Sequence, residues 1–474
     1  MKRFNDGLIF TKENCVGCNK CLSSCPVLGA NVSVSGNDIN TVKVSAKRCI
    51  HCGNCLRTCT KAARAYSDDT DVFFSALSAG KKISLIVSPL FGAAFGDKAG
   101  RILFYLKKHG IRRIYNSAYG AEISLWAHVN YLLAPKVSEE EERAYIANIC
   151  PVLANYAGQC APELLDYIIP VQSPVMSTAV YARKYLGDKS EFAYLGPCIS
   201  KKDEFSDGDS SVSVSYNLTF SRLMSKLRDV ELPGGTAAPE LETNGLGEMI
   251  SVSGGMRDCV SLFVPDDEFL VSSAGFTYEA LSTIKKSASS KNSSVRPLMI
   301  DFSACIYGCA GGSGFSCSEA SSGLIFCRTG KEFRRKFSEN RFGSDHKENL
   351  ARLNRIFSGL RPDDFRRTFG NRYLQPPVIP DNVYDDIFTR MHKTTFQKRT
   401  IDCGSCGYKT CRRMVEAVAL GYSKMENCVN FMHDEMEKLY FTDVQTGLPN
   451  RIDFERRTAK FVEKAADRKY ALAV

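Results

Sequence analysis

The sequence of 474 residues lacks any run of about twenty apolar residues, and its longest candidate is 83–95. A helix needs about twenty such residues to span a bilayer, so no transmembrane segment is predicted. Residues 1–6 lead into no apolar signal region, and Lys and Arg form no block although the formal net charge is +10. We therefore expect a cytoplasmic protein that does not bind nucleic acid, and whose diluted positive charge suits acidic redox partners.

Cysteine, by contrast, is abundant, with 20 residues. Thiolates in such numbers need a reducing, often anaerobic compartment, in agreement with the missing secretion signal. Sixteen of them fall into three cluster-binding patterns, which indicates iron–sulfur sites rather than a disulfide framework. The remaining four, which fit no pattern and which we assign to packing, are Cys160, Cys259, Cys317 and Cys327.

Two C-x2-C-x2-C-x3-C runs stand near the N-terminus, and they resemble those of two-cluster ferredoxins. Their cysteines are Cys15, Cys18, Cys21 and Cys25, followed by Pro26, and then Cys49, Cys52, Cys55 and Cys59. In that family the fourth cysteine of each run reaches across to the other 4Fe-4S cubane. The resemblance implies one cluster on Cys15, Cys18, Cys21 and Cys59, and a second on Cys49, Cys52, Cys55 and Cys25. Zinc, the alternative, would not need the third cysteine of each run.

The middle of the chain alternates short apolar strands, such as 81–87 and 191–195, with amphipathic helices such as 102–109. This alternation predicts α/β layers with parallel strands, and sites tend to lie at the ends of such strands. The second strand runs directly into Gly196-Pro197-Cys198. We therefore expect a ligand-bearing α/β domain.

Four further cysteines lie in three motifs of this domain. The motifs are Cys150-Pro151, the stretch Pro197 to Glu204 (PCISKKDE), and the stretch Ala304 to Gly312 (ACIYGCAGG). Their order and spacing resemble the catalytic domain of iron-only hydrogenases, with supporting similarity at Ser88-Pro89, 116–122, Ser173-Pro174 and 253–256. The alternative for these four thiols is burial in a core without metal.

The resemblance implies that Cys150, Cys198, Cys305 and Cys309 bind a cubane. Cys309 would also bridge to a two-iron subsite carrying CO and cyanide, which completes an H-cluster. Lys201 matches the lysine that hydrogen-bonds a cyanide of the subsite, and Glu204 matches an acid expected to neutralise Lys201. Hydrogen is then the expected ligand or substrate. Gly308, Gly311 and Gly312 are expected to let the backbone approach the cluster.

The departures from the family concern proton delivery. Ile149 stands where catalytic members carry a proton-transferring cysteine, and an aliphatic group can neither take nor give a proton. Gly196 and Ser303 replace two methionines that flank the subsite. An ungapped alignment places His128, Tyr131 and Ile169 at two glutamates and a serine of the relay. Fast hydrogen production is therefore not expected, because each lost acid–base step costs roughly 10² to 10⁴ in rate.

A third group, Cys403, Cys406, Cys411 and Cys428, resembles a small 4Fe-4S domain of multi-cluster redox proteins. Three of these cysteines lie on a glycine-rich loop, and residues 412–427 are predicted to form a helix that returns the fourth. Zinc is the alternative, because four sulfurs suit it too.

Beyond this group, Val429, Met432, Met436 and Leu439 follow the period of a short coiled coil that would form a homodimer. An ordinary amphipathic helix is the alternative. Residues 443–451 and Phe454 resemble the entry of a GGDEF diguanylate cyclase domain, with 469–474 as its first strand. The Gly-Gly-Asp-Glu-Phe signature itself is absent, so we expect the chain to make no cyclic di-GMP and to be a piece of a longer sensor.

The predicted fold is a multidomain α/β protein. We expect a ferredoxin-like α+β domain (1–75), a hydrogenase-like α/β domain with parallel sheets (80–370), a linker (371–400), a small helical 4Fe-4S domain (401–430), and a signalling helix with the truncated GGDEF start (431–474). The expected function is a hydrogen or redox sensor that exchanges electrons with a soluble partner such as ferredoxin. The alternatives are an active iron-only hydrogenase and an electron-transfer module without the two-iron subsite.

The partition of the cysteines is testable. The substitution Cys309→Ala should remove the central bridge and leave the eight N-terminal ligands intact, so the ferredoxin-type electron paramagnetic resonance signals should persist. Loss of those signals as well would show that the partition is wrong.

Overall fold

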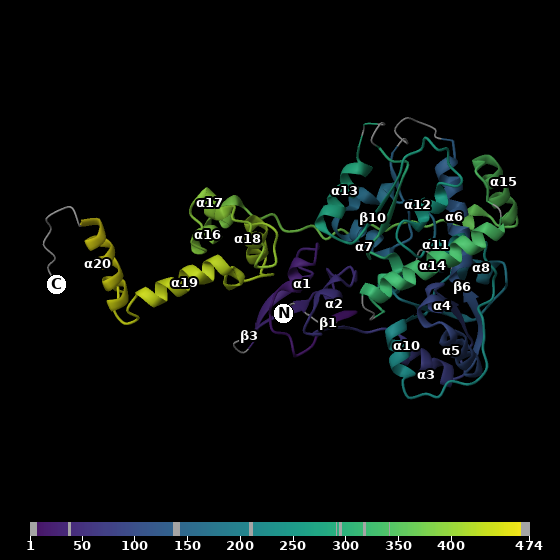
Figure 1. Cartoon of the computed structure of the whole chain (residues 1–474), viewed down its shortest axis with the longest axis horizontal. Helices are drawn as coiled ribbons and strands as arrows, with labels where there is room; N and C mark the ends of the chain where they lie inside the picture. The colour runs from purple at the N-terminus through teal and green to yellow at the C-terminus, as the bar shows by residue number, and fades with distance from the viewer. Residues whose placement is uncertain are drawn as a thin grey trace. The chain divides into compact units, whose positions relative to one another are not determined.

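The structure is a computed structural model that describes residues 7–36, 39–135, 143–207, 212–290, 292, 296–315, 319–340 and 342–465. Cys317 and the predicted strand 469–474 lie outside these residues. The chain divides into two compact units (Figure 1). The first contains 1–15, 24–31 and 43–375, and the second contains 16–23, 32–42 and 376–474. The domain boundaries expected from the sequence stay predictions.

The first unit is built on a four-stranded sheet of parallel strands. The strands lie in the order β6 (Ile111–Asn116), β5 (Ile83–Val87), β8 (Glu191–Gly196) and β9 (Tyr216–Thr219). All five residues of β5 are buried, as expected for a continuous apolar strand covered on both faces. The expected α/β class with parallel strands is confirmed. The strand that follows β5 in the sequence, β6, pairs on one side of β5, and the later strand β8 pairs on the other side. Ligands commonly bind at the carboxyl ends of parallel strands where the strand order reverses in this way.

A second, smaller parallel sheet in this unit has the order β10 (Leu270–Ala274), β11 (Met299–Ser303) and β7 (Tyr145–Ile146). The sequence continues from β11 into Cys305 and from β7 into Cys150. The carboxyl ends of both parallel sheets therefore lead into the motifs that carry cysteine. A short antiparallel pair, β1 (Ile9–Thr11) and β4 (Arg64–Tyr66), belongs to the N-terminal cysteine segment.

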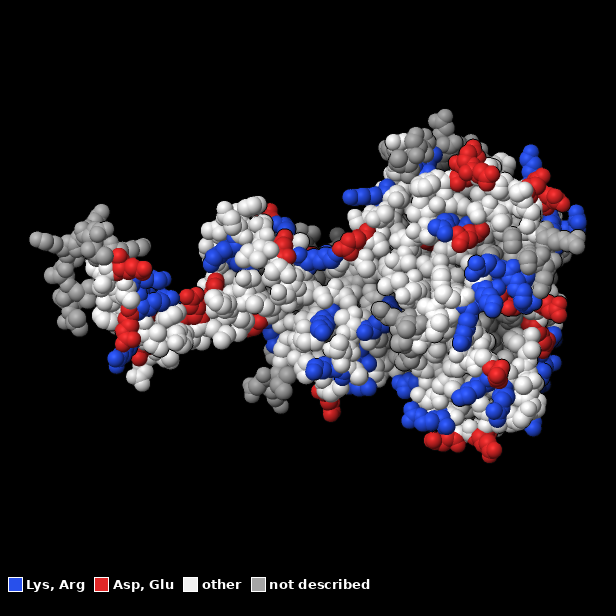
Figure 2. Space-filling view, in the orientation of Figure 1, with Lys and Arg blue, Asp and Glu red and all other residues white. Residues whose placement is uncertain are grey.

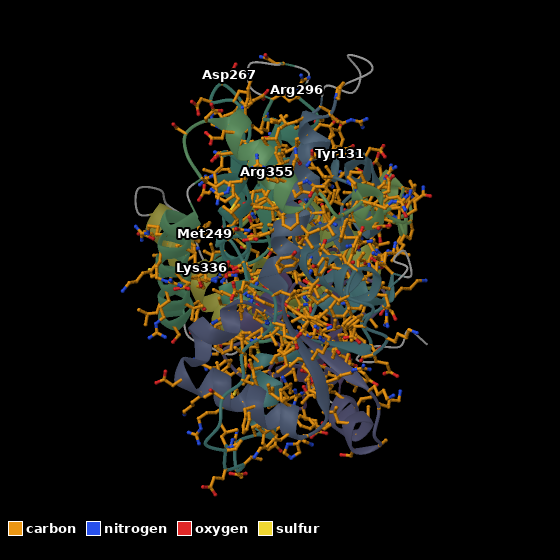
Figure 3. All side chains as sticks on the ribbon, turned by 90° about the vertical axis from the view of Figure 1, so that its right-hand side faces the viewer. Tyr131, Met249, Asp267, Arg296, Lys336 and Arg355 are labelled. Carbon is orange, nitrogen blue, oxygen red and sulfur yellow. The ribbon has the colours of Figure 1, made fainter. Side chains whose placement is uncertain are left out.

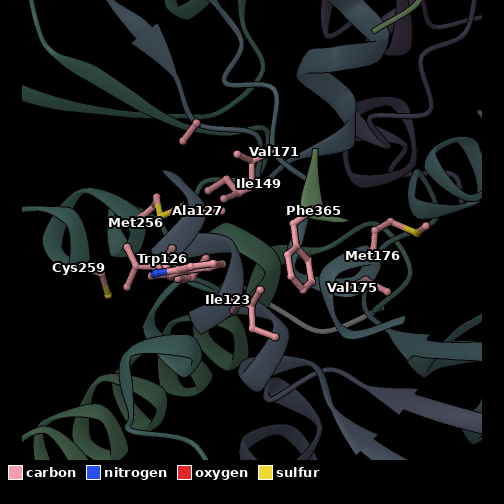
Figure 4. Packing of buried hydrophobic residues seen from close by; sticks show 14 of the residues in the cluster. Ile123, Trp126, Ala127, Ile149, Val171, Val175, Met176, Met256, Cys259 and Phe365 are labelled. Atoms are coloured by element: carbon pink, nitrogen blue, oxygen red, sulfur yellow. The ribbon is translucent and has the colours of Figure 1, made fainter. Parts of the chain in front are cut away.

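Helices cover the larger sheet on both faces. They include α3 (Thr70–Ser78), α4 (Leu90–Phe95), α5 (Asp97–Lys108), α6 (Ser117–Leu133), α8 (Pro174–Lys184) and α10 (Phe220–Lys226). The helix expected at 102–109 is the second half of α5. Apolar side chains of α3, α5 and α10 form one core with β5, whereas α6 and α8 belong to a second core (Figure 4). Each core excludes water from one face of the sheet, and such burial stabilises a fold by about 25 cal/mol per Å² of apolar surface.

Helix α6 is buried along almost its whole length, and its start is fixed by a cap. The side chain of Asn116 accepts a hydrogen bond from the backbone N–H of Ala118 at 3.0 Å, which satisfies one of the free donors of the first turn. Gly120 faces α8 so closely that a Cβ there would overlap Thr178 Oγ1 and the carbonyl oxygen of Pro174. A glycine is therefore required where α6 crosses α8.

The second unit contains residues 32–42, which are most of the hairpin of β2 (Asn31–Gly36) and β3 (Ile39–Val44), and five helices. The helices are α16 (Asp381–Arg390), α17 (Phe396–Arg399), α18 (Cys411–Ala419), α19 (Val429–Phe441) and α20 (Arg451–Ala465). Asn427 ties the hairpin to the third cysteine group, because its side-chain N–H groups donate to Ser33 Oγ at 2.9 Å and its oxygen accepts from Asn40 at 2.9 Å.

The prediction of a single helix over residues 412–427 is wrong. Helix α18 ends at Ala419, because Gly421 adopts a φ of 70° and the N–H of Tyr422 bonds back to the carbonyl of Ala417 at 2.7 Å. This bond pattern, with a left-handed glycine just after the helix, closes helices in general. A separate 3-10 turn, Met425–Asn427, then leads to Cys428.

Charged side chains of both signs interleave on α19 and α20 (Figure 2). Arg456 contacts Asp453 within α20 at 2.7 Å and Glu437 of α19 at 3.4 Å, so the second of these ion pairs links the two helices. Across the described ranges, no helix combines the length and the apolar character that crossing a membrane requires.

The contact between α6 and α8 yields a stability prediction. Gly120→Ala should destabilise the first unit by about 1–3 kcal/mol, because the added methyl group must displace backbone atoms of α8. The matched control is Gly330→Ala in α14 (Glu319–Asn340), where a Cβ meets nothing within 4 Å and better helix propensity should be neutral or slightly stabilising. Urea unfolding followed by circular dichroism measures both, and equal midpoints would contradict the packing described here.

Candidate metal centres

A cavity at the carboxyl ends of the two parallel sheets gathers the four central cysteines. Cys150 is the residue before α7 (Pro151–Cys160), Cys198 follows β8, Cys305 follows β11, and Cys309 lies in a 3-10 turn, Gly308–Gly311. All four line this cluster cavity, together with Lys201. The fold therefore brings together four cysteines that are up to 159 positions apart in the sequence, from Cys150 to Cys309.

The four thiols are buried and close enough to influence one another. Burial raises the pKa of Cys309 to about 12, and the neighbouring Cys150 and Cys305 add to the rise. The pKa of Cys198 is raised well above its usual value, first by burial and then by the other three thiols. Since iron binds thiolates, metal binding here must release protons.

The glycines of the third motif serve the packing of backbone on backbone. A Cβ on Gly308, whose φ is 61°, would lie 2.5 Å from the backbone nitrogen of Ser253. A Cβ on Gly312 would overlap the carbonyl oxygen of Pro197. Gly311 has no such contact within 3.4 Å. We expected these glycines to let the backbone approach a cluster. At Gly308 and Gly312 the neighbouring segments already exclude a side chain, so the absence of a side chain there is explained without a cluster.

A buried ionic group forms one wall of the cavity. Lys201 Nζ donates to Glu204 Oε2 at 2.5 Å and to Ser173 Oγ at 3.1 Å. The other oxygen of Glu204 accepts from Arg367 Nη1 at 2.6 Å. Burial by itself raises the pKa of Glu204, but the two cations outweigh it and the net pKa is lowered. The carboxylate of Glu204 is thus shared by two cations, and Arg367 is also paired with Asp207 at 2.8 Å, so this group holds the Lys201 ammonium beside the thiols.

Three of the four residues at the expected proton relay, Ile149, His128 and Ile169, are unsuited to pass protons in this structure. The fourth, Tyr131, is half-buried, and its ring lies edge-on to that of Tyr145 with 5.4 Å between centroids. Ile149 lines the cluster cavity and packs beside Val171 in a buried apolar cluster (Figure 4). His128 is held by two hydrogen bonds, since Nδ1 lies 2.7 Å from the carbonyl of Ser124 and Nε2 accepts from the N–H of Asn148 at 3.1 Å. Burial lowers the pKa of His128 to about 4, which keeps it neutral. Ile169 is fully buried.

Tyr194 is a cavity residue that the motifs did not reveal. It lies two positions before Gly196 on β8, and alternate residues of a strand face the same side. A Cβ on Gly196 would overlap Cζ and Oη of Tyr194, so the phenol occupies the space that a side chain at position 196 would fill. The signal in the sequence is this pairing of a large residue with a glycine at i, i+2 immediately before Pro197-Cys198.

The second expected ferredoxin set also meets in one cavity. Cys25, Cys49, Cys52 and Cys55 line it, which agrees with the crossed pairing of the two runs. The pKa of Cys49 is raised well above its usual value by burial and then by the charge of Cys55. Of the other set, Cys15 and Cys59 belong to the first unit and Cys18 and Cys21 to the second, so that set stays a prediction.

Two residues connect the ferredoxin-type cavity with the cluster cavity. Cys52 lines both cavities. Arg57, which follows Cys55, directs Nη1 toward Cys305 Sγ at 3.6 Å and toward the carbonyl of Gly311 at 3.3 Å. The two candidate centres are therefore neighbours, and a guanidinium group lies against a sulfur of the central one.

The third group meets in a cavity of the second unit that Cys403, Cys406, Cys411 and Cys428 line together. Cys411 opens α18, and its backbone N–H donates to Asp402 at 2.6 Å. Asn430 donates to Cys403 Sγ at 3.7 Å, and hydrogen bonds from Ser405 lower the pKa of this thiol. Among the cysteines assigned to packing, Cys259 is fully buried, but Cys327 is exposed, so that assignment is wrong for Cys327.

Residues 81–313 match the family model described as iron only hydrogenase large subunit, C-terminal domain. The chain is a hydrogenase-like iron–sulfur protein. Residues 7–60 match a 4Fe-4S dicluster domain, and residues 400–429 match a family model for an Fe-S cluster. These matches support iron–sulfur clusters as the cofactors. No curated protein matches the chain by sequence.

Solved FeFe-hydrogenase structures resemble the hydrogenase-like chain in part. One was described for oxygen inactivation through the 2Fe subcluster of the H cluster (13% identity, TM-score 0.47), one for stepwise H-cluster assembly (11%, 0.46), and one is a variant of HydA1 from Chlamydomonas reinhardtii (13%, 0.47). Each alignment covers 65% of this chain and 100% of that chain.

The donor sets and the sizes of the cavities fit iron–sulfur groups. The cavities of the ferredoxin-type set and of the third group contain about 320 Å³ and about 330 Å³ of space between atoms, and the cluster cavity about 860 Å³, each volume including space that is open to solvent. All three offer four thiols, as 4Fe-4S clusters require. The cluster cavity thus has more than twice the space of the other two, including its mouth.

Arg57 gives a test of the link between the centres. Replacing it with Gln should make the midpoint potential of the central cluster more negative, by on the order of tens of millivolts, because positive charge and N–H groups near a ligand sulfur favour the reduced cluster. The control Arg57→Lys keeps the charge and should recover part of the change. Redox titration followed by electron paramagnetic resonance measures the shift, and an unchanged potential in Arg57→Gln would refute the contact.

Proposed function

We propose that the protein is a sensor of hydrogen or redox state, in which a hydrogenase-like cluster turns over slowly and its charge state is the signal. The observation that carries this proposal is the cluster cavity. It presents four thiols and a lysine ammonium in a space more than twice that of the other four-cysteine cavities, and Ile149 closes it on the side of the expected relay.

The cofactor proposed for this cavity is a cubane on Cys150, Cys198, Cys305 and Cys309, with a two-iron subsite beyond Cys309. When bound, such a group supplies the binding and redox chemistry of hydrogen. Lys201 is the residue proposed to orient an anionic ligand of the subsite, because its ammonium is buried at the cavity wall. Glu204 and Arg367 fix the position of that ammonium from behind.

Electrons are proposed to pass between the cluster cavity and the ferredoxin-type set Cys25, Cys49, Cys52 and Cys55. The support is that Cys52 lines both cavities, so clusters bound in the two cavities would be close neighbours. A soluble redox partner such as ferredoxin is the proposed source or acceptor of these electrons.

An active hydrogenase is the second candidate, and the relay residues argue against it. At the positions of the expected relay, Ile149, Ile169 and the doubly bonded His128 supply no group that titrates near neutral pH, and each such step is worth roughly 10² to 10⁴ in rate. The third candidate is an electron-transfer module without the two-iron subsite. It does not explain why the cluster cavity is larger than the two other four-cysteine cavities.

The proposed output begins at α19. Val429, Met436 and Leu439 are 57%, 65% and 65% exposed, and Met432 is half-buried, so three of the four residues of the apolar stripe expected for a coiled coil are exposed. This supports a homodimer through α19. Residues 443–451, which resemble the start of a GGDEF domain, form a turn in which Asp443 accepts hydrogen bonds from Thr446 N at 2.9 Å and Oγ1 at 2.8 Å, and α20 follows.

The first test is an infrared spectrum of protein purified without oxygen after co-production with hydrogenase maturation enzymes. The proposal predicts iron-bound CO and cyanide bands that shift under hydrogen, together with hydrogen turnover orders of magnitude below that of a catalytic hydrogenase. Fast turnover would favour the second candidate. Absence of the bands in a sample whose cubanes are fully loaded would favour the third.

A further inference from the structure

Besides the apolar wall that carries Ile149, the cluster cavity has a wall that it shares with a second cavity. Two residues, Ser88 and Pro89, line both this cavity and a larger outer cavity of about 1150 Å³. The outer cavity lies at the carboxyl ends of β5 and β6, next to Asn116. Ser88 is therefore the hydroxyl residue at the shared wall between the two spaces.

The outer cavity has the polar groups that hold water. Glu248 lines it, and its Oε2 is buried with no hydrogen-bond partner among the described residues, as is Thr329 Oγ1. Oε1 of Glu248 accepts from Lys336 at 2.5 Å and from Thr243 at 2.6 Å (Figure 3 shows Lys336 beside Met249, the next residue). Buried polar atoms in a space of this size are normally satisfied by water.

Tyr194 stands on the inner side of the same wall. Its phenol end fills the space left by Gly196 in the cluster cavity. The side chain of Ser88 hydrogen-bonds it, and this bond alone would lower the pKa of the phenol. Burial, followed by the charges of Cys309 and Cys198, outweighs that bond and raises the pKa of Tyr194 well above its usual value.

The ionic contacts that run from Lys201 through Glu204 do not form a competing proton route. From Lys201 the contacts run through Glu204 to Arg367, and from there to Asp207 at 2.8 Å. Arg372 then contacts Asp207 at 3.1 Å. A guanidinium group does not give up its proton in proteins, so a chain interrupted by arginine cannot conduct protons.

We propose that Ser88 and Tyr194 form a relay of neutral hydroxyl groups that carries protons between the water of the outer cavity and the cluster cavity, in place of the thiol that Ile149 replaces. This inference rests on the proposed function, because it concerns proton supply to the same cluster. Tyr194 is the residue that faces the proton acceptor in the cavity, and Ser88 connects it to solvent.

The step is balanced without any ionised intermediate at rest. The O–H bond of Tyr194 breaks as its proton passes to the acceptor in the cavity, and the phenolic oxygen takes the proton of Ser88. A water molecule of the outer cavity reprotonates Ser88, and the hydroxide left behind takes up a proton from bulk solvent, which is the net source of the proton delivered. Both hydroxyls are neutral before and after, no electron moves, and each oxygen acts once as donor and once as acceptor, as hydroxyl groups can.

The test uses the full chain with loaded clusters and follows the rate of protonation rather than turnover. After a rapid drop in pH at fixed potential, the cluster's infrared bands shift at a rate set by proton entry. Tyr194→Phe and Ser88→Ala should each slow that shift about tenfold or more. Because the two hydroxyls act in series, the double variant should be no slower than the slower single variant. Ser88→Thr keeps the hydroxyl and should restore the rate.

A matched control is Tyr216→Phe on β9, whose hydroxyl donates to Glu191 at 2.7 Å and lines neither cavity. Its rate should equal that of the parent protein, and the equilibrium band positions should be the same in all variants, which excludes a merely structural effect. Normal bands with unchanged rates in Tyr194→Phe and Ser88→Ala would overturn the relay alone. Absence of the bands in the parent protein would overturn the proposed function, and the relay with it.

Discussion

Four thiol side chains must reach one point from segments that are far apart in the chain, and parallel strands are what brings them there. The carboxyl ends of β8 and β11 deliver Cys198 and Cys305 to the same space, and β7 leads to Cys150. Backbone must then pass very close to backbone, which is why a Cβ at Gly308 or Gly312 has no room. The site is thus a consequence of sheet topology, and its loops need little freedom of their own.

The cluster cavity also has to accommodate a charged group away from bulk water. The shared carboxylate of Glu204 places Lys201 beside the thiols while Arg367 anchors it from behind. Arg57 adds positive charge from the N-terminal segment, at a sulfur of the same set. A buried iron–sulfur group is anionic, so cations on two sides lower the cost of its burial and tune its potential together.

The sequence indicated the site far better than its surroundings. Cysteine spacing identified the three thiol sets that line cavities, and the apolar strand before Cys198 was found, because both signals are local. Arg367, Arg57 and the fit of Tyr194 over Gly196 depend on contacts between distant segments, which no local pattern encodes. The prediction that one helix continues to Asn427 is wrong for a local reason that is visible in the sequence, because a glycine such as Gly421 commonly ends a helix.

The Tyr194 and Ser88 pair bears on why a slow cluster can serve a sensor. A thiol or carboxylate relay holds an acid whose pKa is near the working pH and therefore supplies protons quickly. Two neutral hydroxyls hold no such acid, because burial keeps the phenol of Tyr194 protonated. Under the proposed relay, protons would enter only when a strong base forms in the cavity, as on reduction of a bound cluster. Under the proposed function, proton entry would be tied to the redox state that the sensor reports, and turnover would stay low while the charge state persisted long enough to be read.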